Sequence, residues 1–480
     1  MAPLGMVTRA SASDNHSDIF FMVPQDDSQA DTAAGRRAHN EQYGIREGAY
    51  TAIMQGAGEN YLTAFALTLQ ASTSQIGMLN TLPAFIGIFA QFGSVMWLRC
   101  VGHRHAVVVA GAIAQSLLWL PLLFLPMVFP EYGAVLVIVC AVPLVVVGHF
   151  SIPAWNSLIT DLIDSDRRGV YFARRARIMS ATSFIALVTG GLVLTWTQHR
   201  EVAWAGFTAL FLMAAAARGM AARYLRRLDE SAVPVTAHLH LRLRDCVIAG
   251  RHGDFVRFLG FSGCMHFAAL LAGPYFGVYL LRDLHFTYFE YSAWAATAII
   301  GGFLALNGWG RIGDRYGNKK LLWATGFGVP ILPALYLITD QIWWLMVINC
   351  LGGVVWSGFN LGLQNTVYDL VPSEERAGAV AVSNGVIATS AFLGTMAGGW
   401  LSTVLAPEII FGGFEVHFVS NLLVVFLVSA LLRLAVAIIF IKPLKEVREV
   451  EPISHHELFQ ELPLIKPMMD VIGRRVGHQP

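Results

Sequence analysis

Twelve segments of mostly apolar residues recur along this chain, and this pattern limits the possible fold more than any other feature of the sequence. A helix of about 20 residues is long enough to cross the hydrocarbon core of a bilayer, which is about 30 Å thick. Of the 480 residues, 55% are hydrophobic and 14% are charged, whereas soluble proteins carry about 25% charged residues. We therefore expect an all-α integral membrane protein with twelve transmembrane helices.

The predicted spans fall into two groups of six, separated by a longer polar stretch. They cover residues 48–70, 75–98, 106–129, 132–158, 171–196, 201–223, 257–281, 288–311, 320–340, 342–366, 378–402 and 415–441. Residues 48–223 and 257–441 thus form two six-helix bundles, joined by a central cytoplasmic loop at 224–256. Residues 1–47 are polar without the apolar core of a signal peptide, so we expect a disordered cytoplasmic tail. Residues 442–480 form a second cytoplasmic tail.

The distribution of positive charge predicts which side of the membrane each loop faces. If the N-terminal tail is cytoplasmic, 30 of the 33 lysines and arginines fall in cytoplasmic loops and tails. Only Arg200 and Arg282 fall on the other side, and Arg433 lies within the last span. Because cytoplasmic loops carry the excess of lysine and arginine, we expect both termini in the cytoplasm and the protein in the plasma (inner) membrane.

The two halves repeat each other weakly. Residues 161–169, Asp-Leu-Ile-Asp-Ser-Asp-Arg-Arg-Gly, align with residues 369–377, Asp-Leu-Val-Pro-Ser-Glu-Glu-Arg-Ala, at an offset of 208. The glycines that bound residues 93–102 align with those that bound residues 308–317 at an offset of 215. Parallel six-helix repeats are typical of transporters that bind substrate between the two halves.

A charged, glycine-containing loop follows the eighth span. Its sequence fits Gly310-x-x-x-Asp314-Arg315-x-Gly317-x-Lys319-Lys320. Together with the twelve spans, the repeat and the long central loop, this motif resembles the loop between helices 8 and 9 of the major facilitator superfamily. The resemblance covers residues 48–441. It implies two bundles that rock about a central cavity, so that the substrate site opens to each side in turn.

The resemblance also implies that this motif closes the cytoplasmic side. Asp314 is expected to face the N-terminus of the helix that begins near Val170, where free amides and the helix dipole favour an anion. Arg315 is expected to pair with Asp369, and Arg376 adds to the network. The alternative is that the positive charges only anchor a hairpin on one side. The predicted cytoplasmic gate comprises Gly310, Asp314, Arg315, Gly317, Lys319, Lys320, Asp369, Arg376, Asp161 and Arg168.

The corresponding loop of the first half departs from the motif. Arg99 stands where the acidic residue belongs, although the glycines and a basic end are kept. Asp161 then has Arg99 or Arg104 as a potential partner. We therefore expect the two halves to close the cytoplasmic side differently.

Glu59 lies near the middle of the first span. A carboxylate at the centre of a bilayer costs about 2.5–3.5 kcal/mol, so it is expected to face a cavity or a partner. This makes Glu59 a candidate for coupling proton movement to transport. The alternative is a protonated or hydrogen-bonded glutamate between packed helices.

Several polar and aromatic residues fall at mid-depth on helices that line the cavity of the family. Such side chains suit a neutral or amphiphilic organic solute. The alternative is that the histidines are hydrogen-bonded packing residues and that the aromatic residues fill the helix interfaces. The candidates are Asn60, Tyr61, His149, His266, Tyr275, Tyr279, Trp356 and Asn360.

No motif of an enzyme, metal site or nucleotide-driven pump occurs in the sequence. GxSxG, HExxH and the Walker loop are missing. The five cysteines are far apart without CxxC spacing, so a zinc site is not expected. We expect a proton-coupled transporter of a small organic solute, functional as a monomer in the lipid bilayer, without a cofactor, metal or nucleic-acid partner. A facilitative uniporter and a non-transporting receptor or scaffold are the alternatives.

Overall fold

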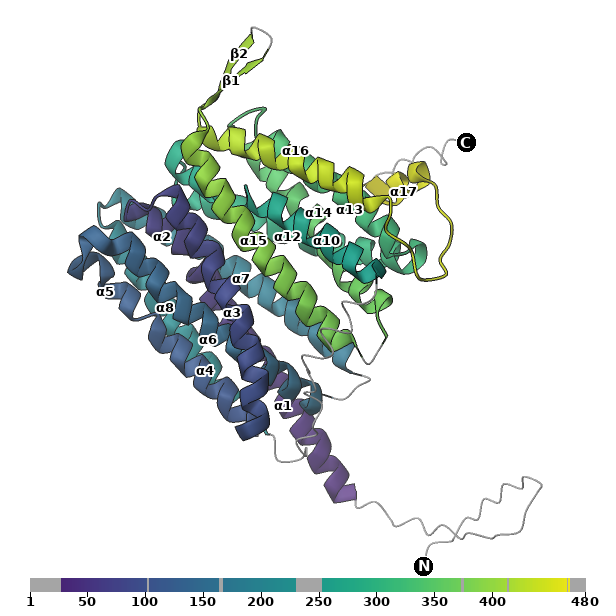
Figure 1. Cartoon of the computed structure of the whole chain (residues 1–480). Helices are drawn as coiled ribbons and strands as arrows, with labels where there is room; N and C mark the ends of the chain where they lie inside the picture. Colours follow the sequence, from purple (N-terminus) through teal and green to yellow (C-terminus); the bar gives the residue numbers. More distant parts are fainter. Residues whose placement is uncertain are drawn as a thin grey trace, which may run out of the picture.

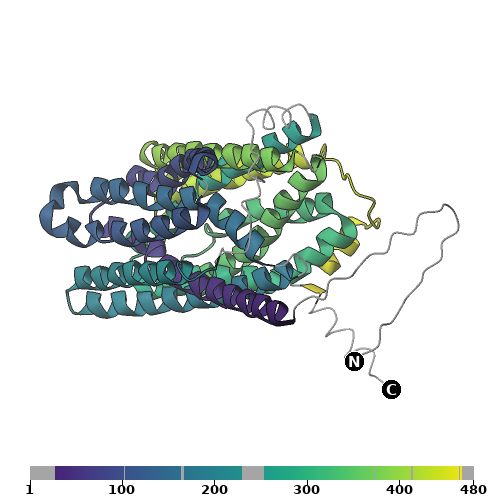
Figure 2. The same ribbon diagram turned by 90° about the horizontal axis from the view of Figure 1, so that it is seen from below.

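The computed structural model describes residues 27–101, 103–163, 167–229, 253–372, 375–411, 414–463 and 465–466. Nearly all regular structure in these ranges is helical, and the long helices lie side by side (Figure 1). Seen from below, helices of the first half, purple to blue, gather mainly on the left, and those of the second half, green to yellow, on the right (Figure 2). The chain thus forms two helical bundles, as the sequence predicts.

The first half contains helices of different lengths and one interrupted span. Its elements are α1 (Asp27–Ala57), η1 (Glu59–Tyr61), α2 (Leu62–Thr68), α3 (Thr73–Val101), α4 (Arg104–Leu118), α5 (Pro121–Val128), η2 (Pro130–Tyr132), α6 (Gly133–Leu162), α7 (Arg168–His199) and α8 (Ala203–Leu225).

The second half repeats this plan and adds a short hairpin and a terminal helix. Its elements are α10 (Gly253–Leu270), α11 (Tyr275–Val278), η3 (Tyr279–Asp283), α12 (Tyr288–Tyr316), α13 (Asn318–Leu335), α14 (Ile342–Leu370), α15 (Arg376–Val404), β1 (Glu408–Phe411), β2 (Phe414–His417), α16 (Asn421–Ile441) and α17 (His455–Glu461).

Ten helical segments of the described residues are long and apolar enough to cross a membrane. They correspond to ten of the twelve predicted spans. The other two predicted spans are also helical, but the first is interrupted at Gly58 and the ninth, α13, begins with the polar sequence Asn-Lys-Lys. The chain is therefore a multi-pass integral membrane protein.

The N-terminal tail differs from the expectation. Helix α1 begins at Asp27, so the described part of the predicted disordered tail is helical. The polar residues that suggested a solvated tail include Asn40 and Glu47, which are 5% and 3% exposed. Partners elsewhere in the bundle satisfy these side chains, and a sequence window cannot detect such partners. Residues 1–26 lie outside the described residues, as do 230–252 of the central loop and 467–480 of the C-terminal tail.

The start of the last span also differs from the expectation. The span was predicted from residue 415, but helix α16 begins at Asn421, where the Ser420 hydroxyl accepts a hydrogen bond from the Leu422 amide at 3.1 Å. The preceding residues form the antiparallel pair β1–β2, with Glu408 opposite His417. The all-α fold thus carries one two-stranded hairpin, which projects from the molecule (Figure 1). Alternating residues such as Phe-Glu-Val-His favour a strand.

Two ends of the molecule can be distinguished by these elements. We call the end with the β1–β2 hairpin the hairpin end; α3, α8, α12 and α16 begin there. The opposite end, where α12 is followed by α13, is called the motif end. The two halves meet where α3 packs against α15 and where α7 packs against α12.

Contacts between the halves run from the hairpin end to the middle of the bundle. Hydrogen bonds between described residues join the halves here: the Arg282 guanidinium donates to the Thr73 hydroxyl at 3.0 Å, the Phe289 amide to the Thr195 hydroxyl at 2.8 Å, and the Tyr291 hydroxyl to the Asn60 carbonyl at 3.4 Å. Near the middle of α3 and α15, the rings of Phe85 and Phe392 stack with centroids 4.9 Å apart. Close approach is possible because Gly191 faces Ser292, where an added Cβ would overlap the serine side chain.

Candidate functional site

The charged motif is more helical than the sequence suggests. Helix α12 continues through Tyr316 and α13 begins at Asn318, so Gly317 alone separates them. Gly317 has φ = 90°, a backbone conformation that side chains disfavour. A Cβ on Gly317 would also overlap the carboxylate of Glu446 in the C-terminal segment. The predicted loop is therefore a single-residue corner, and Asp314 and Arg315 lie on the last turn of α12.

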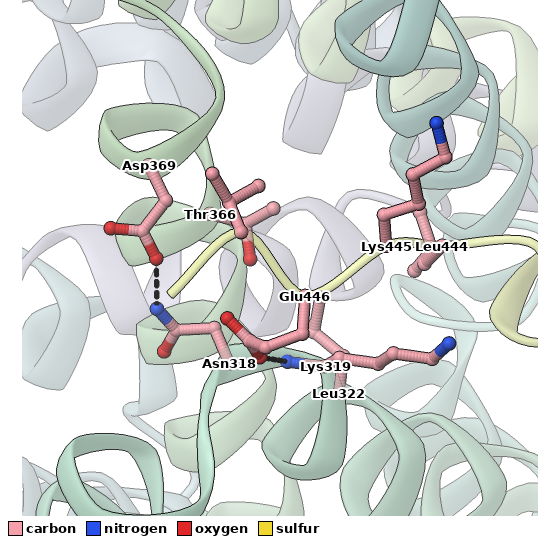
Figure 3. Close-up of a pocket in the computed structure, with 9 residues that line it drawn as sticks. Asn318, Lys319, Leu322, Thr366, Asp369, Leu444, Lys445 and Glu446 are labelled. Atoms are coloured by element: carbon pink, nitrogen blue, oxygen red, sulfur yellow. Dashed lines mark hydrogen bonds between the residues drawn. The ribbon is translucent and has the colours of Figure 1, made fainter. Parts of the chain in front are cut away.

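The expected pair between Arg315 and Asp369 is not formed. Arg315 instead pairs through Nε with Glu451 Oε2 at 2.6 Å. Asp369 Oδ2 accepts from the Asn318 side chain at 2.6 Å and lies 3.5 Å from Nε of Arg448 (the Asn318 bond is drawn in Figure 3). Residues of the C-terminal segment occupy both partners in this conformation, so the pairing of Arg315 with Asp369 stays a prediction for another conformation.

The C-terminal segment also reaches the beginning of α13. The Lys319 amide donates to Glu446 Oε2 at 2.9 Å, as Figure 3 shows. The free amides at a helix N-terminus favour an anion, so this carboxylate is well placed. The Lys319 ammonium donates to the carbonyl of Lys442 at 3.4 Å. A small pocket here is lined by Asn318, Lys319, Leu322, Thr366, Asp369 and residues 444–447.

The remaining gate candidates of the second half are not brought together. Asp314 and Arg376 are exposed and take part in no ion pair with another described residue. No atom lies within 4 Å of a Cβ built on Gly310, and Lys320 is half-buried at the start of α13. Val170, at the start of α7 where Asp314 was expected to dock, is 71% exposed. The docking of Asp314 on α7 therefore stays a prediction for another conformation.

The corresponding acidic residue of the first half finds a partner within its own bundle. Asp161 pairs with Arg104, which is 3% exposed and also donates to the Ser157 hydroxyl at 3.0 Å. Of the two partners considered from the sequence, the structure has Arg104. The Arg99 side chain and Gly102 lie outside the described residues. Arg168 donates to the carbonyls of Ile163 and Thr160 at 3.1 and 2.5 Å, so it caps the end of α6.

Glu59 occupies the interruption of the first span. It is the first residue of η1, directly after Gly58, where an added Cβ would lie 2.6 Å from the ring of Trp119. The interruption follows from this close approach and from the low helix propensity of glycine. Glu59 is half-buried, and the Arg218 guanidinium of α8 attracts its carboxylate.

A buried network of charges lies nearby, and the sequence reasoning missed it. Glu47 of α1 pairs with Arg175 of α7 at 2.8 Å and lies 3.6 Å from Arg218 of α8. Arg218 also donates to Gln115 of α4 at 2.8 Å and to Thr51 of α1 at 2.7 Å. Glu47 and Arg218 are only 3% and 8% exposed. Buried charges persist where they are paired and hydrogen-bonded, so this network holds α1 against three other helices.

The charged residues of this network are visible in the sequence, but they were expected to lie at the membrane surface. Glu47 lies just before the first predicted span, and Arg218 lies near the end of the sixth, where charges normally reach the interface. Arg175 was counted as part of a basic loop, but it lies about two turns inside α7, with its guanidinium carbon 4.4 Å from the centroid of the Trp155 ring.

The three tyrosines among the cavity candidates are packing residues in this conformation. Tyr61, Tyr275 and Tyr279 are at most 1% exposed. The Tyr61 hydroxyl donates to the Leu187 carbonyl, and the Tyr275 hydroxyl donates to the Thr395 carbonyl at 2.6 Å. Tyr279 packs edge-on against a phenylalanine of α16. All three lie toward the hairpin end, where they stabilise the closely packed region.

The two histidines also make local hydrogen bonds. Nδ1 of His149 lies 3.0 Å from the Val145 carbonyl, and Nδ1 of His266 lies 2.8 Å from the Ser262 carbonyl. His266 is 9% exposed, and its ring centroid is 6.1 Å from that of Trp356. These contacts fit packing histidines, which was the alternative given from the sequence.

The remaining two candidates are asparagines with exposed side chains. Asn60 and Asn360 are both exposed. The Asn60 backbone carbonyl accepts a hydrogen bond from Tyr291 of the other half. A role of the two amides in substrate binding stays a prediction.

Part of the chain matches a known protein family in sequence, and the fold is similar to that of solved transporter structures. Residues 258–475 match the family model of the Major Facilitator Superfamily, while no curated protein matches the chain. The structure of the nucleoside transporter NupG superposes with a TM-score of 0.63 at 15% identity, covering 85% of this chain and 98% of that chain. A bacterial homologue of the human lysosomal transporter Spinster, in an inward-facing and unoccupied conformation, gives 0.58 at 16%, covering 77% and 83%. A D-xylose–proton symporter gives 0.56 at 14%, covering 86% and 99%.

Proposed function

We propose that this chain is a proton-coupled secondary transporter of the major facilitator superfamily, a proposal that its overall fold and the family match over its second half support. The family and fold make it a membrane transport protein for small solutes, not an enzyme. The finer proposal is that it moves a small organic solute by alternating access. The position of the contacts between the two halves carries this proposal.

We infer that this conformation is open at the motif end. The hydrogen bonds between the halves lie near the hairpin end, and the stacked rings of Phe85 and Phe392 lie near the middle. Arg315 and Asp369, the expected gate pair, are meanwhile held by other residues. The positive-inside rule assigns the motif end to the cytoplasm, so the open side faces inward. The Spinster homologue, described as inward-facing, supports the same assignment.

Closure of the motif end is proposed to use the charged residues that are unpaired or exchangeable here. Asp314 is exposed and is expected to approach the N-terminal amides of α7 when the halves rock together. Arg315 would then exchange Glu451 for Asp369. Contacts of this kind contribute about 0.5–2 kcal/mol each, which is enough to shift a two-state equilibrium several-fold.

Glu59 is proposed to carry the coupling proton. It lies at the interruption of the first span, half-buried, with the Arg218 guanidinium nearby. A group that alternates between a charged and a neutral form there would change its attraction to Arg218, which also contacts Glu47. Protonation of Glu59 would thus be sensed by the network that holds α1.

The test begins with identification of a solute. Purified protein is screened by thermal shift against neutral organic solutes, including nucleosides and D-xylose, and a stabilising solute is then used for uptake into proteoliposomes. We expect uptake driven by an imposed proton gradient, and Glu59→Gln is expected to lower gradient-driven accumulation at least tenfold while exchange at equal concentrations continues. Glu59→Asp, which keeps a carboxylate at the same position of η1, is the matched control and should retain gradient-driven accumulation.

The outcomes separate the alternatives. Full accumulation by Glu59→Gln would remove Glu59 from the mechanism. Uptake that does not change when the proton gradient is collapsed would identify a facilitative uniporter. If no solute shifts the thermal transition while a protein partner co-purifies, a receptor or scaffold on the same fold is the better description.

A further inference from the structure

The C-terminal segment, residues 442–463, folds back over the motif end of the second half. It leaves α16 and continues to α17, and Figure 1 shows it in yellow beyond the end of α16. Three groups of contacts fix it. The first is the Glu446 carboxylate, which accepts from the Lys319 amide and fits against the backbone of Gly317. This contact fixes the segment to the corner between α12 and α13.

The second group of contacts involves the charged gate residues themselves. Arg448 donates to the Gly313 carbonyl and approaches Asp369 at 3.5 Å. Glu451 pairs with the Arg315 side chain, and its amide donates to the Arg315 carbonyl at 3.1 Å. The segment therefore contacts Arg315 through both side chain and backbone. It supplies a cation to Asp369 and an anion to Arg315 at the same time.

The third group is apolar and anchors the far end of the segment. Helix α17 begins with a capping box in which the Ser454 hydroxyl accepts from the Glu457 amide and the Glu457 carboxylate accepts from the Ser454 amide. These hydrogen bonds lower the pKa of Glu457. Leu458 is fully buried in a cluster with Trp309 and Ile312 of α12. Pro463 lies against Gly308, where an added Cβ would come within 2.8 Å of the proline ring.

Comparison with the first half indicates why Asp369 takes its cationic partner from the C-terminal segment. Asp161 of the first half has Arg104 as a partner from its own bundle. At the offset of 215, the residue that corresponds to Arg104 is Lys319. The Lys319 ammonium donates to the Lys442 carbonyl of the segment. Asp369 therefore receives its cation from Arg448 of the segment instead.

We propose that residues 442–463 form a strap that competes with closure of the gate, by keeping Arg315 and Asp369 from pairing and so favouring the conformation that is open at the motif end. The strap rests on the proposed role of the motif as a gate. In the strap, Glu451 and Arg448 contact Arg315 and Asp369, the two residues that are expected to pair with each other on closure. Release of the strap would free both charges together.

The test measures the distance between the halves at the motif end and needs no substrate. Spin labels are placed at Val170→Cys on α7 and Val256→Cys on α10, which are 71% and 48% exposed, in a full-length chain whose native cysteines are replaced. The strap variant combines Glu446→Gln, Arg448→Ala and Glu451→Gln. We expect the short-distance population to rise at least threefold. Glu451→Gln alone, which leaves the other contacts intact, should give a smaller rise in the same direction.

A matched control lies within the same segment. Glu449 is exposed and forms no ion pair with a described residue, so Glu449→Gln should leave the distance distribution unchanged. If Asp314→Asn alters the distribution and the strap variants do not, the strap proposal is wrong and the gate stands. If neither alters it, the gate proposal itself fails, and the strap fails with it. Thermal unfolding of each variant verifies that the helices remain folded.

Discussion

The two halves bury an arginine at corresponding positions of their last helices but satisfy it in different ways. Arg218 of α8 and Arg433 of α16 are separated by the same offset of 215 that relates the glycine-containing loops. Arg218 contacts the carboxylate of Glu47 and the side chains of Gln115 and Thr51. Arg433, 2% exposed, donates to the carbonyls of Val329 and Ala269 and to the Ser429 hydroxyl at 3.0–3.2 Å.

The difference shows that a buried arginine at corresponding positions can be stabilised either by an ion pair or by hydrogen bonds to backbone carbonyls. In the first half, the attraction depends on the charge of Glu47, so it can be changed by one side chain. In the second half, Ser262 stands at the position of Glu47, and carbonyl oxygens complete the site. Those carbonyls belong to helices and cannot be removed by mutation. Charge changes should therefore destabilise the first half more than the second.

Removal of the shared carboxylate is expected to give the largest effect. Glu47→Ala would leave Arg175 and Arg218 buried without their anion, and breaking a buried pair on one side costs about 3–5 kcal/mol. Thermal unfolding in detergent should show a large fall in the transition temperature. Glu41→Ala removes a more exposed pair with Arg167 and is expected to cost at most about 1 kcal/mol. Equal losses in the two variants would contradict the buried network.

A smaller difference in stability cost is expected between loss of the Asp161–Arg104 pair and loss of the Asp369–Arg448 pair. Arg104→Ala would remove a cation that is 3% exposed and leave Asp161 without its partner; we expect a cost of about 2 kcal/mol. Arg448→Ala should cost less than about 1 kcal/mol, because the Arg448 and Asp369 side chains are 36% and 21% exposed and Asn318 still donates to Asp369. Chemical or thermal unfolding of the two variants compares them directly. If Arg448→Ala lost more stability than Arg104→Ala, the partner from the C-terminal segment would matter more to Asp369 than the partner within the bundle matters to Asp161, contrary to this expectation.

The smallest effect is expected for the arginine without an acidic partner. Arg433→Met keeps an unbranched apolar stem at the buried position and removes the guanidinium. The carbonyls of Ala269 and Val329 remain in helices, so no buried charge is left unpaired. We expect a change in the free energy of unfolding within about 1 kcal/mol, of either sign. A loss comparable to that of Glu47→Ala would show that the two halves are held alike.

Hydropathy was sufficient to predict the helical spans. The described segments from α3 to α16 lie close to their predicted ranges because lipid-facing residues give a strong local signal. Asp314, Arg315 and Gly317 belong to the motif that carries the resemblance, and they lie within the residues that match the family model. The sequence could not predict which charges pair, since the partners come from distant parts of the chain.

Two differences between expected and observed partners show this limit in physical terms. Glu47 looked like part of a solvated tail because its partners, Arg175 and Arg218, lie in other helices. Arg315 was assigned to Asp369 because the family motif says nothing of the C-terminal segment, where Glu451 lies. The seventh span shows a smaller limit, since its turn after Leu270 and the π-helical η3 depend on local packing around Pro274.

The interrupted first span has a consequence for how the protein is made. The α1–η1–α2 segment is not among the ten helices that are apolar enough to cross a membrane by composition, and it carries Glu47 and Glu59. Its cationic partner Arg175 is synthesised 128 residues after Glu47. The translocon therefore meets a first segment whose charge is neutralised only once α7 and α8 have followed it. Stable insertion of the N-terminal helix is thus a late event in biogenesis, and truncated nascent chains that end before α7 should leave it accessible to water.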